Sequence, residues 1–474
     1  MAAFEQHSVV VVGAGISGLA AAWWLRKSGF DVCVLEHDGA VGGTMKTIHR
    51  DGWLIEAGPN SALETTPLLR QLSIDVGIEN ELIYANEAAD KRYILRAGAL
   101  HALPMKPGLF LGSRLWSLRG KLRLLLEPFI GRSSKEETIA EFVSRRLGSE
   151  FLDYAINPFV AGVYAGNPEQ LSVQAAFPKL YALEKNYGGL IKGQLLGAKE
   201  RKKHAEKAKD RSRLFSYTLG MQTLPDGIAR ALHGSIHLNV NVENIHVISQ
   251  NGSGSSKRFK ITGTKNGREL TVDANAVILA VPSQNAAAII RTLDAPLATS
   301  LKNIYYPPVT EVFLGFARDD ISRPLDGFGF LIPAKENRGI LGTIWSSVIF
   351  PGRTPPGYVA LTSFVGGSRQ PELASLDDKT LIALVMRELQ SIMNVKGVPA
   401  FTHVSRWEKA IPQYHLGHLS IVRQMEQFED RYSGLFLSGN FRGGIAVGDC
   451  VINSELTAQR AAQYLANTST EISA

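Results

Sequence analysis

A buried strand that runs straight into a glycine-rich turn restricts this chain more than any other feature. Residues 9–12 are four valines, which is typical of a strand buried on both faces of a parallel sheet. The turn that follows has the pattern G-x-G-x-x-G at Gly13, Gly15 and Gly18, and it opens an apolar helix. A second strand is expected over residues 31–35. The chain therefore begins with a strand, a helix and a second strand in close succession.

This order of elements is typical of a nucleotide-binding βαβ unit. In such a unit the first glycine permits the tight turn, the second lets the backbone approach a pyrophosphate, and the third allows the helix to pack closely. The helix N-terminus holds the phosphates, and a carboxylate about twenty residues further on binds the ribose hydroxyls. Glu36 stands at that position, so the sequence predicts a bound nucleotide.

A second glycine pair, Gly42 and Gly43, follows shortly after the first turn, where it could continue the support of the pyrophosphate. Further glycines follow a predicted strand at Gly58 and occur near the end of the chain at Gly439 and at 443–444. A nicotinamide enzyme needs one such turn, whereas a flavin that lies lengthwise in a protein needs support at its adenine, its pyrophosphate and its ring. We therefore expect three separated segments to converge on one FAD.

The nucleotide unit needs more strands than residues 8–60 supply, and the pattern indicates that the chain returns to its sheet. Residues 236–248 alternate like a strand, a turn is expected at 251–256, and a hairpin is expected at Asn266-Gly267. The hairpin leads into a buried strand over residues 276–281. The sequence thus predicts an α/β fold whose nucleotide-binding domain is discontinuous in the chain.

Length and composition exclude several classes of protein. A chain of 474 residues can hold two or three domains. Its two cysteines, Cys33 and Cys450, offer neither a disulfide framework nor metal spacing, so a reducing compartment is expected. His415 and His418 lack a third ligand, and no metal site is expected. No apolar run approaches the roughly 18 residues that span a bilayer, and no export signal is expected at residues 1–7.

The net charge of +7 is unevenly distributed. Residues 91–135 hold ten Lys or Arg and one acidic residue, Glu127, interleaved with Leu, Phe and Trp. This composition suits an anionic lipid surface, and the alternative is a core helix with basic flanks. A capping box is predicted at Ser134 and Glu137. A second basic run at 199–213 is polar throughout and favours a solvated helix or loop. No nucleic-acid motif accompanies the charge, so no nucleic-acid partner is expected.

Three motifs together resemble the flavin-containing amine oxidase superfamily. They are GAGISG at 13–18, E-x-x-x-x-x-GG at 36–43, and GN-x-x-GG-x-x-V at 439–447. The resemblance implies a Rossmann-like FAD-binding domain of the amine-oxidase/GDI type, an α+β substrate domain and a helical membrane-contacting domain that lines the pocket. The expected boundaries are 1–90, 214–300 and 405–474 for the FAD-binding domain, 91–213 for the helical domain, and 301–404 for the substrate domain.

The same resemblance implies which residues contact a non-covalent FAD and its substrate. The FAD contacts that it implies are Gly13, Ala14, Gly15, Ile16, Ser17, Gly18, Glu36, His37, Gly43, Thr44, Gly58, Pro59, Asn60, Ser61, Val242, Trp407, Gly439, Ile445, Ala446 and Val447. The substrate contacts that it implies are Arg92, Gly166, Leu331, Ile344 and Phe364. An arginine suits a propionate, and the apolar side chains suit a pyrrole ring. From pattern alone, those apolar residues are ordinary core strand residues.

The stretches KRYILRAGALHALP and NPFVAGVYAGNPEQLS resemble the members of the superfamily that oxidise porphyrinogens. The implied activity is the oxygen-dependent, six-electron oxidation of protoporphyrinogen IX to protoporphyrin IX, with release of hydrogen peroxide and with no catalytic side chain required. The alternatives are coproporphyrinogen III oxidation, amine oxidation, and a GDI-like binding protein without redox chemistry. The resemblance also implies a possible homodimer. It implies a cytoplasmic protein that is attached peripherally to the inner membrane, and the alternative location is the mitochondrial inner membrane.

Overall fold

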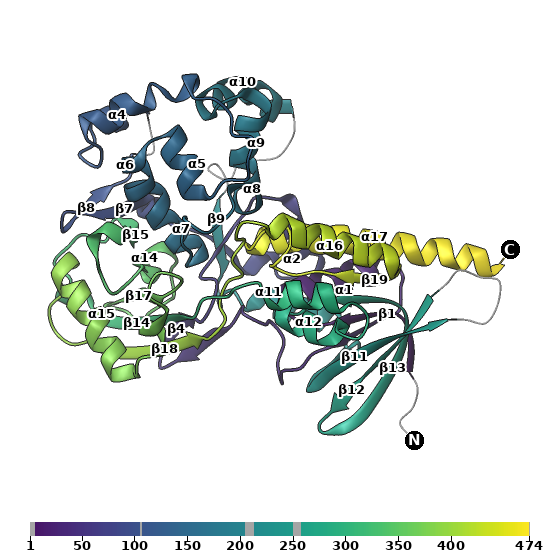
Figure 1. The fold of residues 1–474 in the computed structure, drawn as a ribbon. Helices are drawn as coiled ribbons and strands as arrows, with labels where there is room; N and C mark the ends of the chain where they lie inside the picture. The colour runs from purple at the N-terminus through teal and green to yellow at the C-terminus, as the bar shows by residue number, and fades with distance from the viewer. Residues whose placement is uncertain (1–4, 105–106, 204–212, 250–256, 474) are drawn as a thin grey trace.

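The computed structural model describes residues 5–104, 107–203, 213–249 and 257–473. Within them, two seven-stranded sheets lie in separate parts of the molecule, and a lobe of helices extends beyond the second sheet (Figure 1). The turn expected at 251–256 and most of the basic run at 199–213 fall outside the described residues.

The first sheet contains the predicted βαβ unit. Its strands, in order across the sheet, are β10 (Ile236–His237), β2 (Val32–Leu35), β1 (Glu5–Val12), β13 (Arg268–Leu279), β12 (Lys257–Lys265) and β11 (Val240–Ser249). The first four run parallel, and β11, β12 and β13 form the predicted antiparallel meander. The last half of β13 also pairs with β19 (Leu435–Leu437), so the N-terminal, middle and C-terminal parts of the chain share one sheet. The predicted α/β fold is confirmed, and the strands of this sheet come from separated parts of the chain.

Helices bury both faces of this sheet because β1 and β2 are apolar on both sides. One face is covered by α1 (Ile16–Lys27), α2 (Pro67–Asp75), α11 (Thr223–Ala231) and the long C-terminal α17 (Val447–Ser473). The other face is covered by α12 (Ser283–Ile290), α13 (Ala295–Lys302) and α16 (His418–Arg431).

The second sheet has one face in a core and one face toward the first sheet. Its strands, in order, are β18 (Phe401–Trp407), β14 (Val309–Ala317), β17 (Tyr358–Gly366), β16 (Gly342–Ile344), β15 (Gly327–Leu331), β7 (Lys91–Arg96) and β8 (Ala99–Ala102). Leu381, Val385 and Leu389 of α15 (Asp378–Met393) pack against Val312 and Leu314 of β14. The sheet extends past the divisions expected at residues 91 and 405, since β7 and β18 belong to it.

Short strands join the two sheets. β3 (Thr47–Arg50) pairs with β4 (Trp53–Glu56), and β9 (Leu214–Tyr217) pairs with both β5 (Ala62–Leu63) and β6 (Leu82–Tyr84). Trp53 of β4 packs between Phe313 and Phe401 of the second sheet, so β4 connects the glycine-rich N-terminal part to that sheet.

The helical lobe is built on a buried charge network. Its helices are α3 (Pro107–Gly112), α4 (Leu118–Leu124), α5 (Ile139–Arg146), α6 (Ser149–Phe151), α7 (Asn157–Tyr164), α8 (Val173–Ala176), α9 (Pro178–Tyr187) and α10 (Leu190–Lys203). The fully buried Arg146 binds Glu127 at 3.1 Å and also pairs with Glu184. Glu127 in turn accepts the backbone amide of Leu190 at 2.7 Å, which caps α10.

The predicted capping box was wrong by one turn. The box lies at Thr138 and Glu141, where Glu141 N donates to Thr138 Oγ1 at 3.1 Å and Thr138 N donates to Glu141 Oε2 at 2.8 Å. Glu137 instead pairs with Arg145 through its carboxylate. Both segments fit the S/T-x-x-E pattern, so tertiary pairing decides between them.

Among the described residues, no helix has the combined length and apolar character needed to cross a bilayer.

Candidate functional site

In the first glycine turn, close packing requires glycine at two positions, whereas the third position faces open space. A Cβ at Gly18 would lie 1.9 Å from the carbonyl oxygen of Gly13, and a Cβ at Gly13 would lie 2.5 Å from that of Ala280. Gly15 precedes α1 and has no heavy atom within 4 Å of such a Cβ. The space in front of Gly15, at a helix N-terminus, fits the position expected for a pyrophosphate.

The carboxylate of Glu36 folds back onto this turn. Its Oε2 accepts the backbone amide of Ala14 at 2.5 Å, and its Oε1 accepts that of Asp38 at 2.8 Å. The backbone carbonyl of Glu36 accepts the amide of Val240 at 2.8 Å, which places the half-buried Val242 two residues further along β11. His37 is exposed beside them. The residues expected at the adenosine end therefore lie together.

The second glycine pair lies against the first turn. The amide of Gly42 donates to the carbonyl of Ala14 at 2.9 Å, and Gly15 and Gly42 form an isolated parallel bridge. A Cβ at Gly43 would approach the Cα of Gly15 to 3.2 Å, and Gly43 has a φ of +57°. The two glycine turns are close together in sequence because they are neighbours in the structure, with Thr44 exposed at their edge.

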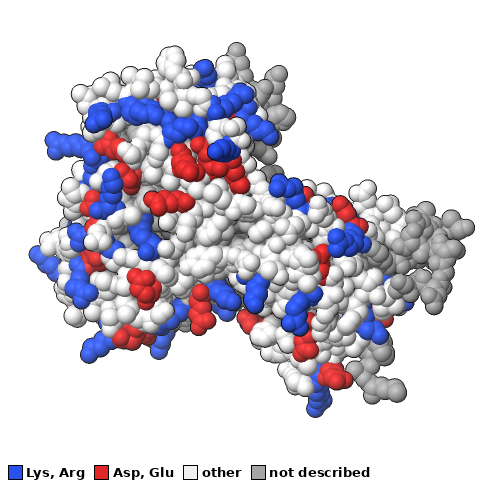
Figure 2. Space-filling model, viewed as in Figure 1, with Lys and Arg blue, Asp and Glu red and all other residues white. Residues whose placement is uncertain are grey.

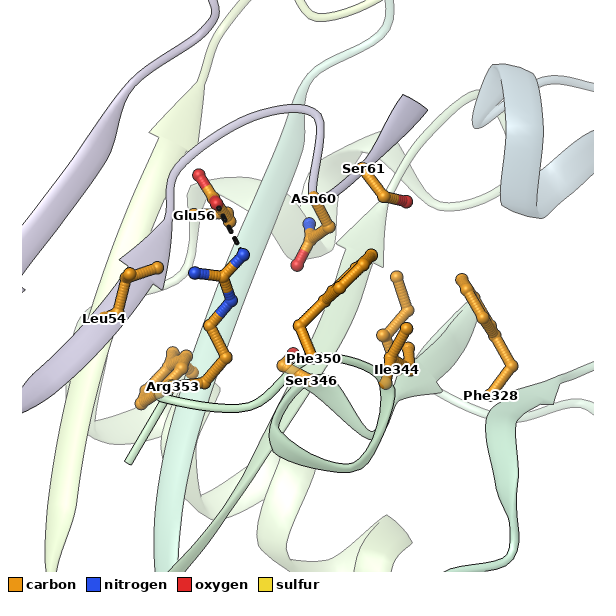
Figure 3. Close-up of a pocket in the computed structure, with 11 residues that line it drawn as sticks. Leu54, Glu56, Asn60, Ser61, Phe328, Ile344, Ser346, Phe350 and Arg353 are labelled. Atoms are coloured by element: carbon orange, nitrogen blue, oxygen red, sulfur yellow. Dashed lines mark ion pairs between the residues drawn. The ribbon is translucent and has the colours of Figure 1, made fainter. Parts of the chain in front are cut away.

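The third segment, residues 58–61, continues from Thr44. A Cβ at Gly58 would lie 2.0 Å from the carbonyl oxygen of Thr44, so only glycine fits there. Pro59 follows, the side chain of Asn60 donates to the carbonyl of Gly58 at 3.2 Å, and Ser61 ends the segment before β5. Figure 3 shows Asn60 and Ser61 at the rim of a pocket that the second sheet closes from below.

The C-terminal glycines reach both earlier segments through the start of α17. Gly439, Gly443 and Gly444 all have positive φ values, and the amide of Gly444 donates to the Tyr414 hydroxyl at 3.1 Å. Ile445 and Ala446 lead into α17, which begins at Val447 and packs beside α1, where Ile16 and Ser17 begin the helix. The Ser17 side chain hydrogen-bonds the buried Cys450 thiol. A Cβ at Gly448 would lie 2.8 Å from Thr65 Oγ1, so α17 also touches the end of the third segment.

Trp407 lies at the same junction. It pairs in register with Val309, the ammonium of Lys46 lies 5.7 Å from its ring centre, and its indole nitrogen has no hydrogen-bond partner among the described residues. A buried donor without a partner is costly, so this nitrogen is suited to a ligand.

Three of the expected substrate residues lie on one face of the second sheet. Leu331 and Phe364 both pair with Gly342, one from each side, and Ile344 is two residues further along the same strand. Directly paired residues of neighbouring strands project on the same face, and so do alternate residues of one strand. A Cβ at Gly342 would lie 2.5 Å from the carbonyl oxygen of Phe330 and 3.1 Å from Leu331 Cδ2, so the Leu331 side chain covers this glycine. All three apolar side chains are half-buried.

Arg92 and Gly166 lie at different edges of this face. The exposed Arg92 guanidinium lies 5.8 Å from the ring centre of Phe328, which lines the pocket with Ile344. Gly166 is buried, and a Cβ there would lie 2.5 Å from Gln413 Oε1. The neighbouring Ala165 packs beside Phe364. The structure thus brings four of the five residues to one face, with the buried Gly166 next to it through its neighbour Ala165.

Two buried glutamates at the pocket escaped the sequence prediction. Burial raises the pKa of Glu56 to about 7, although Thr47 Oγ1 donates to it at 2.7 Å and Arg353 lies 3.8 Å away (Figure 3). Burial, and then repulsion from Glu56, raises the pKa of Glu311 well above its usual range. The signal was available, because Glu311 lies inside an apolar strand and Glu56 ends one.

A family model described as flavin containing amine oxidoreductase matches residues 16–464. Among curated proteins, protoporphyrinogen oxidase 2 of Arabidopsis thaliana is 34% identical over 98% of this chain and 95% of its own length. Coproporphyrinogen III oxidase of Bacillus subtilis is 30% identical over 96% of this chain and 98% of its own.

Solved structures share the architecture. A protein from Exiguobacterium sp. 255-15, assigned as a protoporphyrinogen oxidase, superposes with a TM-score of 0.77 at 23% identity over the whole of both chains. A variant of putrescine oxidase superposes with a TM-score of 0.70 at 18% identity, covering 98% of this chain and the whole of the other. At these identities the superpositions establish the fold.

Proposed function

Because the chain belongs to the flavin-containing amine oxidoreductase family, we propose that it binds FAD non-covalently and oxidises protoporphyrinogen IX to protoporphyrin IX with dioxygen as acceptor. The observation that carries the proposal is that Ile344, on the same face as Leu331 and Phe364, lines one pocket with Asn60 and Ser61 of the third glycine segment. The chain is also 34% identical over 98% of its length to a protoporphyrinogen oxidase. FAD, when bound, accepts two electrons from a carbon–hydrogen bond and passes them to dioxygen.

The chain's own residues bind and orient. Gly15 and Gly43 leave room for the pyrophosphate, Glu36 accepts the ribose hydroxyls, and residues 445–447 support the flavin ring. Leu331, Ile344 and Phe364 hold the macrocycle by its apolar faces, and Arg92 pairs with a propionate at the pocket edge. Placement of the reacting carbon supplies much of the rate enhancement.

The second candidate substrate is coproporphyrinogen III, which the Bacillus subtilis relative favours. An amine is disfavoured because the Arg92 guanidinium would repel its ammonium group. Supplying protoporphyrinogen and coproporphyrinogen separately under air, and measuring porphyrin fluorescence and peroxide, tests the proposal. We expect about three peroxides per protoporphyrin, from the six electrons removed two at a time. A strong preference for the four-propionate substrate would move the assignment to coproporphyrinogen. If neither porphyrin is formed, both candidate functions are wrong.

We also propose that the helical lobe rests on an anionic membrane surface. The exposed apolar side chains of α3, α4 and the turn after them include Leu111, Leu118, Leu122, Leu125 and Phe129, with Leu118 74% and Phe129 85% exposed. Figure 2 shows a row of Lys and Arg across this lobe, with uncharged atoms above it. Apolar side chains that enter the interface and cations at headgroup level are typical of peripheral membrane binding.

A flotation assay with vesicles that contain phosphatidylserine tests this part. The protein should float with the vesicles, less so at high salt. Changing Leu118, Leu122 and Phe129 to Ser should leave it in solution, whereas Val398→Ser, at an 82% exposed site between α15 and β18, should change nothing. If all three proteins behave alike, the membrane proposal is wrong. The three-domain division, attachment at the cytoplasmic face and a homodimer remain parts of the proposal; sedimentation tests the dimer.

A further inference from the structure

One carboxyl group lies in the middle of the sheet face that carries the expected substrate residues. Glu311 of β14 pairs with Phe364 of β17 on one side and with Ser405 of β18 on the other. Since Phe364 pairs with Gly342, and Gly342 with Leu331, the side chain of Glu311 shares a face with those of Phe364 and Leu331. Its place on the sheet is therefore beside the proposed macrocycle site.

Glu311 is buried without full hydrogen bonding. The residue is 6% exposed, and the Gly58 backbone and the Asn60 side chain, which both favour the ionised form, only partly offset the effect of burial on its pKa. Oε2 has no hydrogen-bond partner in the part of the chain that the structure describes. A buried carboxyl oxygen without a partner costs free energy, so its retention indicates a ligand group at this position. Asn60 lines the pocket, and so does Phe313, which is two residues from Glu311 along β14 and on the same face, so the carboxyl group lies next to that pocket.

The charges around Glu311 strengthen its affinity for a proton. Glu56 repels its negative charge, and the nearby Arg353 lies 3.8 Å from Glu56 and pairs with that residue. On β18, His403 is two residues from Ser405 on the same face, and burial lowers its pKa. Lys46 lies over Trp407 at the end of that strand. No cation forms an ion pair with Glu311 among the described residues. Its carboxylate is accordingly a stronger base than an exposed one.

We propose that Glu311 accepts the proton that the porphyrinogen releases in each two-electron step. This inference rests on the proposed function. Each step breaks a carbon–hydrogen bond, whose hydrogen leaves with both electrons to FAD, and releases one proton from a pyrrole nitrogen or a second carbon, whose electron pair stays on the macrocycle. Dioxygen then takes the two electrons and, in total, two protons to give hydrogen peroxide. Glu311 thus returns its proton to solvent before the next step, and three steps remove six hydrogens.

Glu311→Gln tests the proposal because it keeps the shape and removes the base. Anaerobic reduction of bound FAD by protoporphyrinogen should slow by about 100-fold or more, while FAD content stays unchanged. In the unaltered protein the rate should rise with pH through the titration of Glu311, and this rise should be absent from Glu311→Gln. Glu311→Asp, which keeps a carboxylate, should restore part of the rate and the pH dependence.

Glu56→Gln is the matched control, because it removes the neighbouring carboxyl. It should retain the pH-dependent step but move its midpoint to lower pH, since the repulsion that disfavours ionised Glu311 is gone. If Glu56→Gln abolishes the step and Glu311→Gln only shifts it, the base is Glu56 and the proposal is wrong. An unchanged rate and pH profile in Glu311→Gln overturns it as well.

Infrared spectroscopy gives a readout that does not depend on turnover. As pH rises, the difference spectrum between the unaltered protein and Glu311→Gln should lose the carbonyl band of a protonated carboxylic acid and gain carboxylate bands over the same pH range in which the rate rises. A carbonyl band that persists unchanged through that rise would contradict the inference, because a protonated acid cannot accept a proton. If the unaltered protein oxidises no porphyrinogen while this band is present, the proposed function is wrong although Glu311 is a buried acid. A failure of the proposed function is therefore distinguishable from a failure of the proposed role of Glu311.

Discussion

Glu36 accepts a hydrogen bond from the backbone amide of Ala14, with 2.5 Å between Oε2 and the nitrogen. The carboxylate at the end of β2 is thereby held at the first glycine turn, where the ribose is expected. Changing Glu36 to Ala should weaken FAD binding by about ten- to a hundredfold, because hydrogen bonds to a charged acceptor are worth roughly 1.5–3 kcal/mol.

Quenching of flavin fluorescence during titration of the FAD-free protein measures this loss. Glu269→Ala, at an exposed site near the hairpin end of β13, is the control and should bind FAD normally. Equal affinities for the two variants would mean that Glu36 does not hold the ribose.

Gly15 and Gly18 should respond differently to the same substitution. Gly15→Ala meets no atom within 4 Å, so the protein should fold normally and lose affinity for FAD, because the added methyl group occupies the pyrophosphate space. Gly18→Ala would place Cβ 1.9 Å from the Gly13 carbonyl oxygen and should lower the thermal midpoint. Thermal unfolding without FAD, compared with FAD titration, separates the two effects. A stable Gly15→Ala protein with full FAD affinity would place the pyrophosphate elsewhere.

Arg92 should affect substrate and not cofactor. The exposed guanidinium stands beside Phe328, and no ion pair engages it among the described residues. Arg92→Ala should therefore raise KM for protoporphyrinogen by about tenfold or more, the value of a charge-assisted hydrogen bond, with little change in FAD content. Arg119→Ala, a change to another exposed arginine, is the control for net charge. A loss of FAD from the Arg92 variant would show that the pocket is misplaced.

Glu56 should make stability depend on pH. Its pKa in the folded protein is about 7, against 4.5 for the ordinary group, so the folded state holds a proton that the unfolded state releases between these values. The contribution of Glu56 to the free energy of unfolding is thus fully present below about pH 4.5. As pH rises through 7, the free energy of unfolding falls by roughly 3 kcal/mol. Chemical denaturation between pH 5 and 8 should give a shallower decline for Glu56→Gln.

Glu79→Gln is the control for that measurement, because Glu79 is exposed and pairs with Arg70 at the surface. Its profile should match the unaltered protein. A Glu56→Gln profile as steep as the original would mean that Glu56 is ionised throughout this range.

The local fold near each glycine turn followed from the sequence, because strand, turn and helix there obey short-range rules. The strand over 9–12, the helix after Gly15 and the hairpin at Asn266-Gly267 are all present. Strand pairings between distant segments were less predictable from the sequence. β7 and β8, expected in a helical region, join the second sheet because Arg92, Tyr93 and Ile94 pair with β15, more than two hundred residues later.

The buried carboxyl groups were harder still to recognise. β14 is buried along nearly its whole length, so no alternation marks which face Glu311 occupies. Only the register with Phe364 and Ser405 assigns that face. The available signal was a single acidic residue inside an apolar strand. Its role depends on which strands pair with β14, and the sequence alone does not predict that pairing.

The most direct test of the account is the visible spectrum of the purified protein during anaerobic addition of protoporphyrinogen. We expect a flavin spectrum that bleaches on addition of the substrate and returns on admission of air, and one FAD per chain when the protein is denatured. A colourless protein that does not take up FAD, or a flavin spectrum that protoporphyrinogen leaves unchanged, would contradict it.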